Sequence, residues 1–296
     1  MTRILAAPKV HTRHYVGVKG VKLTADIGGD PAATAVILLH GGGQTRHSWS
    51  GAMRSLMARG YHTINLDARG HGDSEWATDG DYSLDTLAGD LECVVMTLRS
   101  RPALVGASLG GATSLLLAGM QPQLAAALVL VDIVPQIDSQ GADRIRGFMR
   151  SGLGGFATLE DVADAVAAYN PLRPRPNSHA GLMKNLRRGG DGRLYWHWDP
   201  RLLDETEPAE PPMFAERLNS AAERVRVPTL LVRGMKSDIV TEAGVADFRQ
   251  HLTRLEVLDV NDAGHMVAGD KNDAFNEGVL SFLRRCIPPM AHAAFE

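Results

Sequence analysis

The sequence predicts an α/β protein with a mostly parallel central sheet and helices on both faces of that sheet. Short apolar segments alternate with longer amphipathic ones along most of the chain, a pattern typical of strand–helix–strand units. Several short segments, AVILL at Ala35–Leu39 among them, are continuously apolar, as expected for parallel strands that are covered on both faces. The 296 residues fit one such core with a sizeable insertion.

The pattern of apolar residues gives the expected elements in chain order. Arg13–Ile27 alternates around Gly20, which predicts two antiparallel strands joined by a tight turn. Leu84–Leu98 repeats its apolar residues with the period of a helix. The other expected strands are Ala35–Leu39, His62–Leu66, Ala103–Ala107, Leu124–Val134, Thr229–Val232 and Leu255–Val260. The other expected helices are Trp49–Arg59, Leu109–Met120, Ala243–His251 and Ala274–Cys286.

The character of the sequence changes between residues 135 and 226. This segment contains helical patterns but no convincing strand, and Pro-rich breaks interrupt it. We therefore expect residues 1–134 and 227–296 to form the core of the protein. Residues 135–226 are expected to form a helical cap, or lid, inserted above the sheet.

Composition and charge argue against several classes of protein. The net charge is −3 with no polybasic run, which argues against a nucleic-acid or anionic-membrane partner. Cys93 and Cys286 belong to no metal-spaced cluster and predict free thiols in a reducing compartment. The amino-terminal segment lacks a signal-peptide core, and no apolar run approaches the ~20 residues of a membrane span. We expect a cytoplasmic protein and leave its oligomeric state open, a homo-oligomer included.

Ser108 lies in the strongest motif of the chain, Gly-Ala-Ser-Leu-Gly at residues 106–110. The motif directly follows an expected strand and leads directly into an expected helix, which is the context that a G-x-S-x-G nucleophile elbow requires. Such a sharp turn forces an unfavourable backbone conformation on the serine, and the flanking glycines let the strand and the helix approach closely. The hydroxyl is then presented at the positive end of a helix. We interpret Ser108 as a nucleophile.

A serine hydroxyl needs a base within hydrogen-bond reach, and we expect His265 to be that base. His265 follows the last strand, so it lies at the sheet edge where the carboxyl ends of the strands gather. The acid that orients His265 is expected at the same edge. Asp238 is our first choice, because the chain order Ser108, Asp238, His265 matches that of triads built on a nucleophile elbow. Asp132, at the end of an earlier strand, stays open as the alternative.

Acyl transfer also needs hydrogen-bond donors for the oxyanion that develops on the substrate. The backbone amide of Leu109 is one expected donor of this oxyanion hole. The second is expected from the HGGG loop at residues 40–43, with Gly42 as the first choice and Gly43 as the second. Gly43, Gln44 and Trp49 are further candidates for substrate contact, for which a structural role is equally open. Trp198 is another candidate, although for the large apolar side chains of the insertion we favour packing of the insertion onto the body.

Together with the segment Asp67–Ser74, these motifs resemble the α/β-hydrolase family. The likeness is greatest to its branch of capped esterases, cofactor-free haloperoxidases, epoxide hydrolases and carbon–carbon bond hydrolases, and it covers residues 12–134 and 227–287. It implies the α/β-hydrolase fold, no metal or organic cofactor, and a structural role for Asp67–Ser74. Relatives that open epoxides or cleave carbon–halogen bonds carry aspartate at the elbow, so Ser108 excludes those two activities.

The leading hypothesis is a serine hydrolase that cleaves an ester or a related acyl bond of a small to medium substrate through an acyl-enzyme. Two alternatives use the same catalytic triad. One is cleavage of a carbon–carbon bond in a diketone-type substrate, and the other is perhydrolase or haloperoxidase-like activity. A ligand-binding receptor on the same fold stays open as a non-enzymatic alternative, because a fold does not fix a function.

Overall fold

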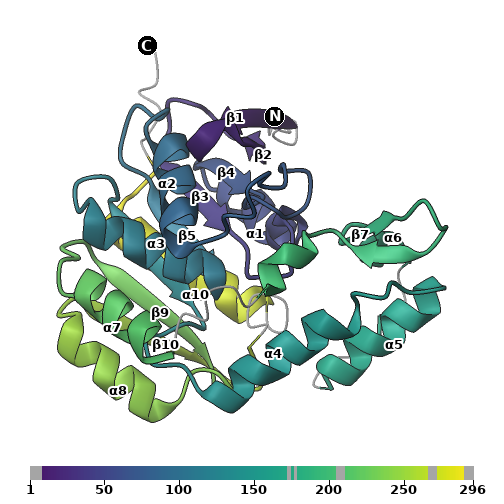
Figure 1. Ribbon diagram of the computed structural model, residues 1–296. Helices are drawn as coiled ribbons and strands as arrows, with labels where there is room; N and C mark the ends of the chain where they lie inside the picture. Colours follow the sequence, from purple (N-terminus) through teal and green to yellow (C-terminus); the bar gives the residue numbers. More distant parts are fainter. Residues whose placement is uncertain (1–8, 172–174, 177–178, 205–210, 266–271, 290–296) are drawn as a thin grey trace, which may run out of the picture.

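The computed structural model describes residues 9–171, 175–176, 179–204, 211–265 and 272–289 (Figure 1). Within these residues, eight strands form one sheet. In spatial order they are β1 (Val10–Val16), β2 (Lys22–Gly28), β4 (His62–Leu66), β3 (Ala35–Leu39), β5 (Ala103–Ala107), β6 (Ala127–Val131), β9 (Thr229–Gly234) and β10 (Leu255–Val260). β2 is antiparallel to both β1 and β4, and every other neighbouring pair is parallel. The predicted mostly parallel sheet is confirmed.

Helices cover both faces of this sheet. One face carries α2 (Leu84–Val95), α3 (Leu109–Met120), α7 (Pro211–Ala222) and α8 (Glu242–His251). The other face carries α1 (Ser50–Met57) and α10 (Asn272–Cys286). Between β6 and β9 the chain forms α4 (Ser139–Ser151), α5 (Leu159–Tyr169), α6 (His179–Met183), β7 (Leu186–Arg188) and β8 (Leu194–Trp196). The described residues also form the short 3-10 helices η1 (Val18–Gly20), η2 (Arg46–Trp49) and η3 (Pro200–Leu203).

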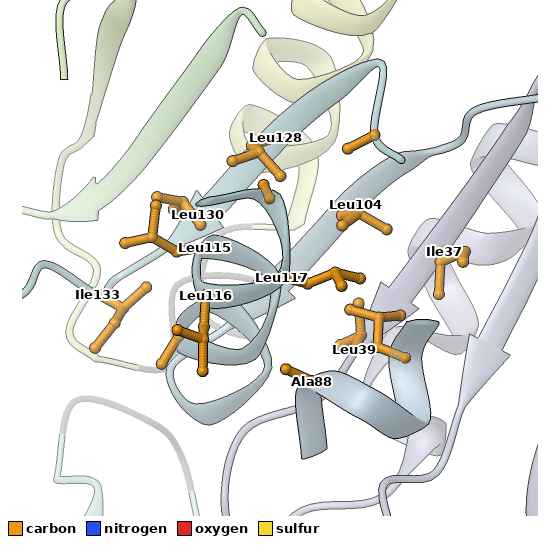
Figure 2. Close-up of a cluster of buried hydrophobic side chains, with 14 of the residues drawn as sticks. Ile37, Leu39, Ala88, Leu104, Leu115, Leu116, Leu117, Leu128, Leu130 and Ile133 are labelled. Carbon is orange, nitrogen blue, oxygen red and sulfur yellow. The ribbon is translucent and has the colours of Figure 1, made fainter. Parts of the chain in front are cut away.

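The two faces have separate hydrophobic cores because successive side chains of a strand point to opposite sides. In β3, Ile37 and Leu39 pack with α2 and α3, whereas Val36 and Leu38 pack with α1 and α10. Figure 2 shows the first of these cores, where the leucines of α3 lie among the side chains of several strands. α3 is buried along nearly its whole length, so the residue just before it is held firmly in place.

Several elements have the bounds that the sequence predicts. They are the strands Ala35–Leu39, His62–Leu66, Ala103–Ala107 and Leu255–Val260 and the helix Leu109–Met120. The antiparallel pair expected within Arg13–Ile27 is also confirmed. The strand expected at Leu124–Val134 is shorter, since the chain turns at Asp132, where φ is 50°.

The segment between β6 and β9 differs from the expected all-helical insertion. β7 and β8 form an antiparallel hairpin, so the expectation of no strand here was wrong. Each of these strands has only three residues, too few for an alternating pattern to stand out. In addition, α7 packs against α3 on the body of the protein. The elements from α4 to β8 share a third buried cluster and extend to one side of the sheet in Figure 1.

None of the helices in the described part of the chain combines the length and the apolar character that crossing a membrane requires.

Candidate active site

Four loops that carry chemically reactive groups follow parallel strands of the sheet. Ser108 follows β5, Asp132 follows β6, Asp238 lies in the loop after β9, and His265 lies in the loop after β10. Because these strands are parallel neighbours, their carboxyl ends meet at one edge of the sheet. The HGGG loop after β3 joins them there, since β3 pairs with β5.

Ser108 occupies a tight turn between β5 and α3. Its φ of 47° and ψ of −113° lie outside the regions that residues with a side chain favour. The turn needs glycines around it. A Cβ atom on Gly106 would lie 2.3 Å from the carbonyl carbon of Gly110, and one on Gly110 would lie 2.6 Å from the carbonyl oxygen of Leu39. The turn therefore has the close strand–helix contact that the motif predicts.

His265 contacts Asp132. Its Nδ1 lies 2.8 Å from Asp132 Oδ2, and since a carboxylate oxygen accepts, Nδ1 carries the proton and donates it. Asp132 is fully buried and accepts two more hydrogen bonds, from the amide of Gly234 (3.1 Å) and from Ser237 Oγ (2.5 Å). The Nε2 atom of His265 is thereby left as the basic nitrogen. The loop before His265 is fixed by the amide of Lys236, which donates to the carbonyl of Ala263 (2.9 Å).

The expected pairing of Asp238 with His265 was wrong. Asp238 Oδ2 lies 2.8 Å from Arg144 Nη2 on α4, with the Asp238 side chain 30% exposed. Next to it, Ser237 Oγ accepts hydrogen bonds from the amides of Ile239 (3.1 Å) and Val240 (3.2 Å). These bonds curl the loop so that Ser237 faces Asp132 and Asp238 pairs with α4. The structure places the alternative carboxylate, Asp132, against His265.

The HGGG loop lies beside the elbow. A Cβ atom on Gly41 would lie 3.5 Å from Cβ of Ser108, and one on Gly42 would lie 3.9 Å from Cδ2 of Leu109. The loop closes as a turn in which the amide of Gln44 donates to the carbonyl of Gly41 (3.1 Å). Gly42 and the amino-terminal end of α3 are therefore neighbours, as expected of two groups that serve one site.

Comparison with known proteins identifies the family. A family model described as the alpha/beta hydrolase fold matches residues 34–271. The chain belongs to the α/β-hydrolase family. It is 32% identical to the esterase Rv0045c of Mycobacterium tuberculosis, over 85% of this chain and 83% of that protein. It is also 32% identical to 2-(acetamidomethylene)succinate hydrolase of Mesorhizobium japonicum, over 70% of this chain and 73% of that protein.

Superposition on solved structures supports the same family assignment. The M. tuberculosis esterase superposes with a TM-score of 0.75 at 30% identity, over 94% of this chain and 93% of that chain. An E-2-(acetamidomethylene)succinate hydrolase superposes with a TM-score of 0.81 at 24% identity, over 93% of this chain and 99% of that chain, which shows the shared fold. Because its similar relatives are named as esterases and hydrolases, this α/β-hydrolase is a hydrolase.

The segment Asp67–Ser74 of this α/β-hydrolase is organised by buried ion pairs. Asp67 accepts from the backbone amide of Arg46 (2.7 Å), from its guanidinium, and from the amide of Asp73 (2.9 Å). Burial disfavours the charge of Arg46, but Asp67, Asp73 and Asp26 together raise its pKa above the usual range. These contacts fix the loops behind the site and support the structural role that the resemblance implies for this segment.

A second buried pair ties the same segment to α2. Arg69 donates two hydrogen bonds of 2.6 Å each to the two carboxylate oxygens of Asp90. Arg69 also donates to the carbonyl of Val18 (3.1 Å), which links the first hairpin to this cluster. A bidentate pair of this kind fixes both position and orientation.

The remaining candidates for substrate contact lie in different parts of the structure. Trp49 is 2% exposed and belongs to the core beneath α1 and α10, where its ring packs with apolar side chains. Trp198 is 3% exposed, lies in the cluster of α4 to β8, and pairs through its backbone with His71. Gln44 accepts a hydrogen bond from the amide of Gly41 (3.2 Å). Both tryptophans are therefore packing residues in this structure.

Three further residues at the site were not assigned a role from the sequence. Ser237 donates to Asp132, His71 accepts from the amide of Gly43, and Met149 of α4 packs over Gly43. No local motif marks the first or the third of them. His71 lies in the segment Asp67–Ser74, to which the family resemblance assigns a structural role, and its contact with the HGGG loop forms only when the chain folds.

Among the residues that the structure describes, no group of three or more His, Cys, Asp or Glu side chains is arranged to hold a metal ion.

Proposed function

We propose that this α/β-hydrolase cleaves an ester or a related acyl bond through a covalent acyl-enzyme on Ser108. The observation that carries the proposal is the 2.8 Å hydrogen bond between Asp132 and His265, at the sheet edge where Ser108 is presented in a strained turn. A nucleophile, a base and a group that orients the base are the three parts that nucleophilic catalysis by serine requires.

The reaction runs in two halves. Ser108 Oγ attacks the carbonyl carbon, and His265 Nε2 takes the hydroxyl proton. The tetrahedral intermediate collapses, the carbon–oxygen bond to the alcohol breaks, and His265 protonates the departing alcohol. Water then attacks the acyl carbon while His265 takes a proton from it. The bond between this carbon and Ser108 Oγ breaks, His265 returns the proton to Ser108 Oγ, and the carboxylic acid leaves. Throughout, the buried carboxylate of Asp132 holds the tautomer of His265 and stabilises its protonated form.

The negative charge on the substrate oxygen is held by the amides of Gly42 and Leu109. Their proximity on neighbouring loops supports this assignment, and so does the position of Leu109 at the first turn of α3, where helix amides point outward. A single donor of this kind is worth about 10²–10³ in turnover in another serine hydrolase.

We assign the elements from α4 to η3 the role of a cap, or lid, over this site. Met149 of α4 supports the role, because its Cε atom would lie 3.3 Å from a Cβ atom on Gly43. A cap that approaches the HGGG loop so closely limits the room for the acyl group, which favours a small to medium substrate.

The bond that is cleaved is to be determined with a panel of substrates. The named relatives act on esters and on 2-(acetamidomethylene)succinate, so p-nitrophenyl esters of increasing acyl length come first. A diketone, a lactone and a peracid-forming assay test the alternatives that share the same residues. Turnover of esters well above that of the diketone is expected.

The assignment of Ser108 is tested by labelling. A fluorophosphonate should modify the wild-type protein in the peptide that contains Ser108, and Ser108→Ala should abolish labelling and lower ester turnover by ~10⁶-fold, the loss found in another serine hydrolase. Ser55→Ala, on α1 in contact with Arg59, is the control and should keep both. Label on another residue, or a Ser108→Ala protein that still turns over the ester, would refute the proposal.

A further inference from the structure

Two buried imidazoles lie behind the HGGG loop. His40 is 1% exposed and His71 is fully buried, and their ring centroids are 5.0 Å apart. Each ring joins the loop to the segment Asp67–Ser74, so the two segments are tied together twice. Neither ring belongs to the proposed catalytic residues.

The partners of each ring determine which nitrogen carries the proton, since a carbonyl can only accept and a backbone amide can only donate. His40 Nδ1 donates to the carbonyl of Gly41 (2.8 Å), and its Nε2 accepts from the amide of Ala68 (3.0 Å). His71 Nδ1 donates to the carbonyl of Arg69 (3.0 Å), and its Nε2 accepts from the amide of Gly43 (3.2 Å). Both rings are therefore neutral in this arrangement. Burial lowers the pKa of His40 to about 4 and that of His71 to about 3, which keeps them neutral over the ordinary pH range.

The three glycine amides of the loop differ in their partners. The amide of Gly41 donates to Gln44 Oε1 (3.2 Å), and the amide of Gly43 donates to His71 Nε2 (3.2 Å). Within the described part of the chain, the amide of Gly42 has no hydrogen-bond acceptor. It is therefore the amide of the loop that is available to a substrate.

We propose that His71 is a positioning residue that holds the amide of Gly43 inward and so leaves Gly42 as the oxyanion donor of the loop. The inference rests on the proposed function and adds a residue to it. Gly43 has a φ of 73°, a conformation that glycine adopts readily, so its own backbone does not fix the direction of its amide, and the His71 acceptor does. Without that acceptor the part-buried amide of Gly43 has no partner within the loop, and the peptide rotates to find another one.

The segment that carries His71 is itself anchored to the cap. The amide of Gly72 donates to the carbonyl of His197 (2.7 Å), the amide of Asp199 donates to the carbonyl of Gly70 (2.8 Å), and His71 pairs with Trp198. The residues directly before and after His71 are thus both hydrogen-bonded to the cap. These bonds fix the position of His71 Nε2 relative to the loop.

The inference is tested with His71→Leu, which removes the acceptor, and His71→Gln, whose amide oxygen can replace Nε2. Rates are divided by the fraction of sites that a fluorophosphonate titrates to completion. For His71→Leu we expect kcat to fall by about 10- to 100-fold, up to the loss of one oxyanion donor, with KM changed less than about threefold. His71→Gln should recover at least about tenfold of that loss. His14→Leu, which removes a hydrogen bond to Thr24 between β1 and β2, is the matched control and should leave kcat unchanged.

A second measurement needs no variant. In the wild-type protein, a ¹⁵N–¹⁵N coupling across the hydrogen bond should connect the Gly43 amide with His71 Nε2. Absence of that coupling overturns the inference, as does a His71→Leu protein with wild-type kcat per titrated site. Equal losses in the Leu and Gln variants also overturn it, because they indicate a role in packing alone. If the wild-type protein is not labelled at Ser108, the proposed function fails first and the inference fails with it, so the two failures are distinguishable.

Discussion

Asp132 and Asp238 both follow parallel strands of the sheet, but the protein surrounds them differently. Asp132 is fully buried and accepts three hydrogen bonds, from Gly234, Ser237 and His265. A buried carboxylate needs such donors to stay charged, and its charge then acts in a medium where water screens it little. Asp238 is part-exposed and pairs with Arg144, whose side chain is 60% exposed, so water weakens that interaction. The environment of Asp132 is the one that stabilises a protonated imidazole.

The neutral imidazoles of His40 and His71 predict how stability depends on pH. Both pKa values lie far below the ordinary value of 6.5, so the unfolded chain binds more protons than the folded one between about pH 6.5 and pH 4. The free energy of unfolding therefore decreases as the pH falls through this window. For the two rings together we expect a loss of about 2–4 kcal/mol between pH 7 and pH 5.

Denaturant unfolding at pH 7, 6 and 5 measures this loss. His71→Gln has no imidazole to protonate and keeps the acceptor, so its stability should fall less steeply with acid than that of the wild-type protein. His14→Leu should keep the wild-type slope, because His14 lies on an exposed edge strand. Parallel curves for the wild-type protein and His71→Gln would contradict the account of these rings.

Single residues also mark the limit of what the sequence can predict. Ser108, His265 and both candidate carboxylates follow from their positions after apolar strands. The choice between the carboxylates does not, because it depends on how Ser237 bonds with the amides of Ile239 and Val240 and turns the loop. From the sequence, chain order favours Asp238, and the place of Asp132 at the end of an apolar strand favours a role in capping the turn. Such a short side-chain contact has no signature in a single sequence.

At the scale of elements, the contact between β3, β5 and α3 sets the position of Ser108. A Cβ atom on Gly110 would meet two backbone carbonyl oxygens, those of Leu39 at 2.6 Å and His40 at 2.7 Å. These carbonyls belong to the last residue of β3 and to the residue after it, whose backbone the sheet holds in place, so Gly110→Ala should destabilise the protein by about 3 kcal/mol. Gly147→Ala is the control, since a Cβ atom there would have nothing within 4 Å and the residue is in the interior of α4.

Chemical denaturation measures both variants. Gly147→Ala should be neutral or stabilise the protein by up to about 1 kcal/mol, because alanine loses less freedom than glycine in a helix. Gly110→Ala should also lower ester turnover, as the elbow shifts with α3. A Gly110→Ala protein as stable as Gly147→Ala would show that the elbow tolerates a wider strand–helix spacing than the structure indicates.

The predictability of an element depends on its length and on what covers it. Four strands have the bounds that the sequence predicts. Of these, β3 and β5 are continuously apolar and almost wholly buried, whereas β4 and β10 contain polar residues and β10 is mostly part-exposed. The hairpin of β7 and β8 is missed because its three-residue strands bury only alternate side chains against a small cluster. The sequence pattern assigns the residues of α7 to the insertion, but in the structure Leu218 and Ala221 of α7 pack in the core that contains α3.

For the whole molecule, the sheet brings together groups that are far apart in sequence. His265 and Asp132 are separated by 133 residues, and the pairing of β6 with β9 and of β9 with β10 places their loops at one edge. The insertion begins after β6 with α4, and Met149 of α4 contacts the HGGG loop at Gly43. The general fold class follows from the sequence, whereas this approach of the insertion to the loop depends on packing between distant segments.

The central claim is that Asp132, rather than Asp238, serves His265 during catalysis by Ser108. The most direct measurement compares ester turnover by Asp132→Asn and Asp238→Asn, two variants with the same chemical change in neighbouring loops. Loss of the acid that fixes the histidine tautomer costs about 10⁴-fold in kcat in another serine hydrolase. We predict a loss of that order for Asp132→Asn and a change of less than about threefold for Asp238→Asn, whose ion pair is largely solvated. A larger loss in Asp238→Asn than in Asp132→Asn would contradict the account.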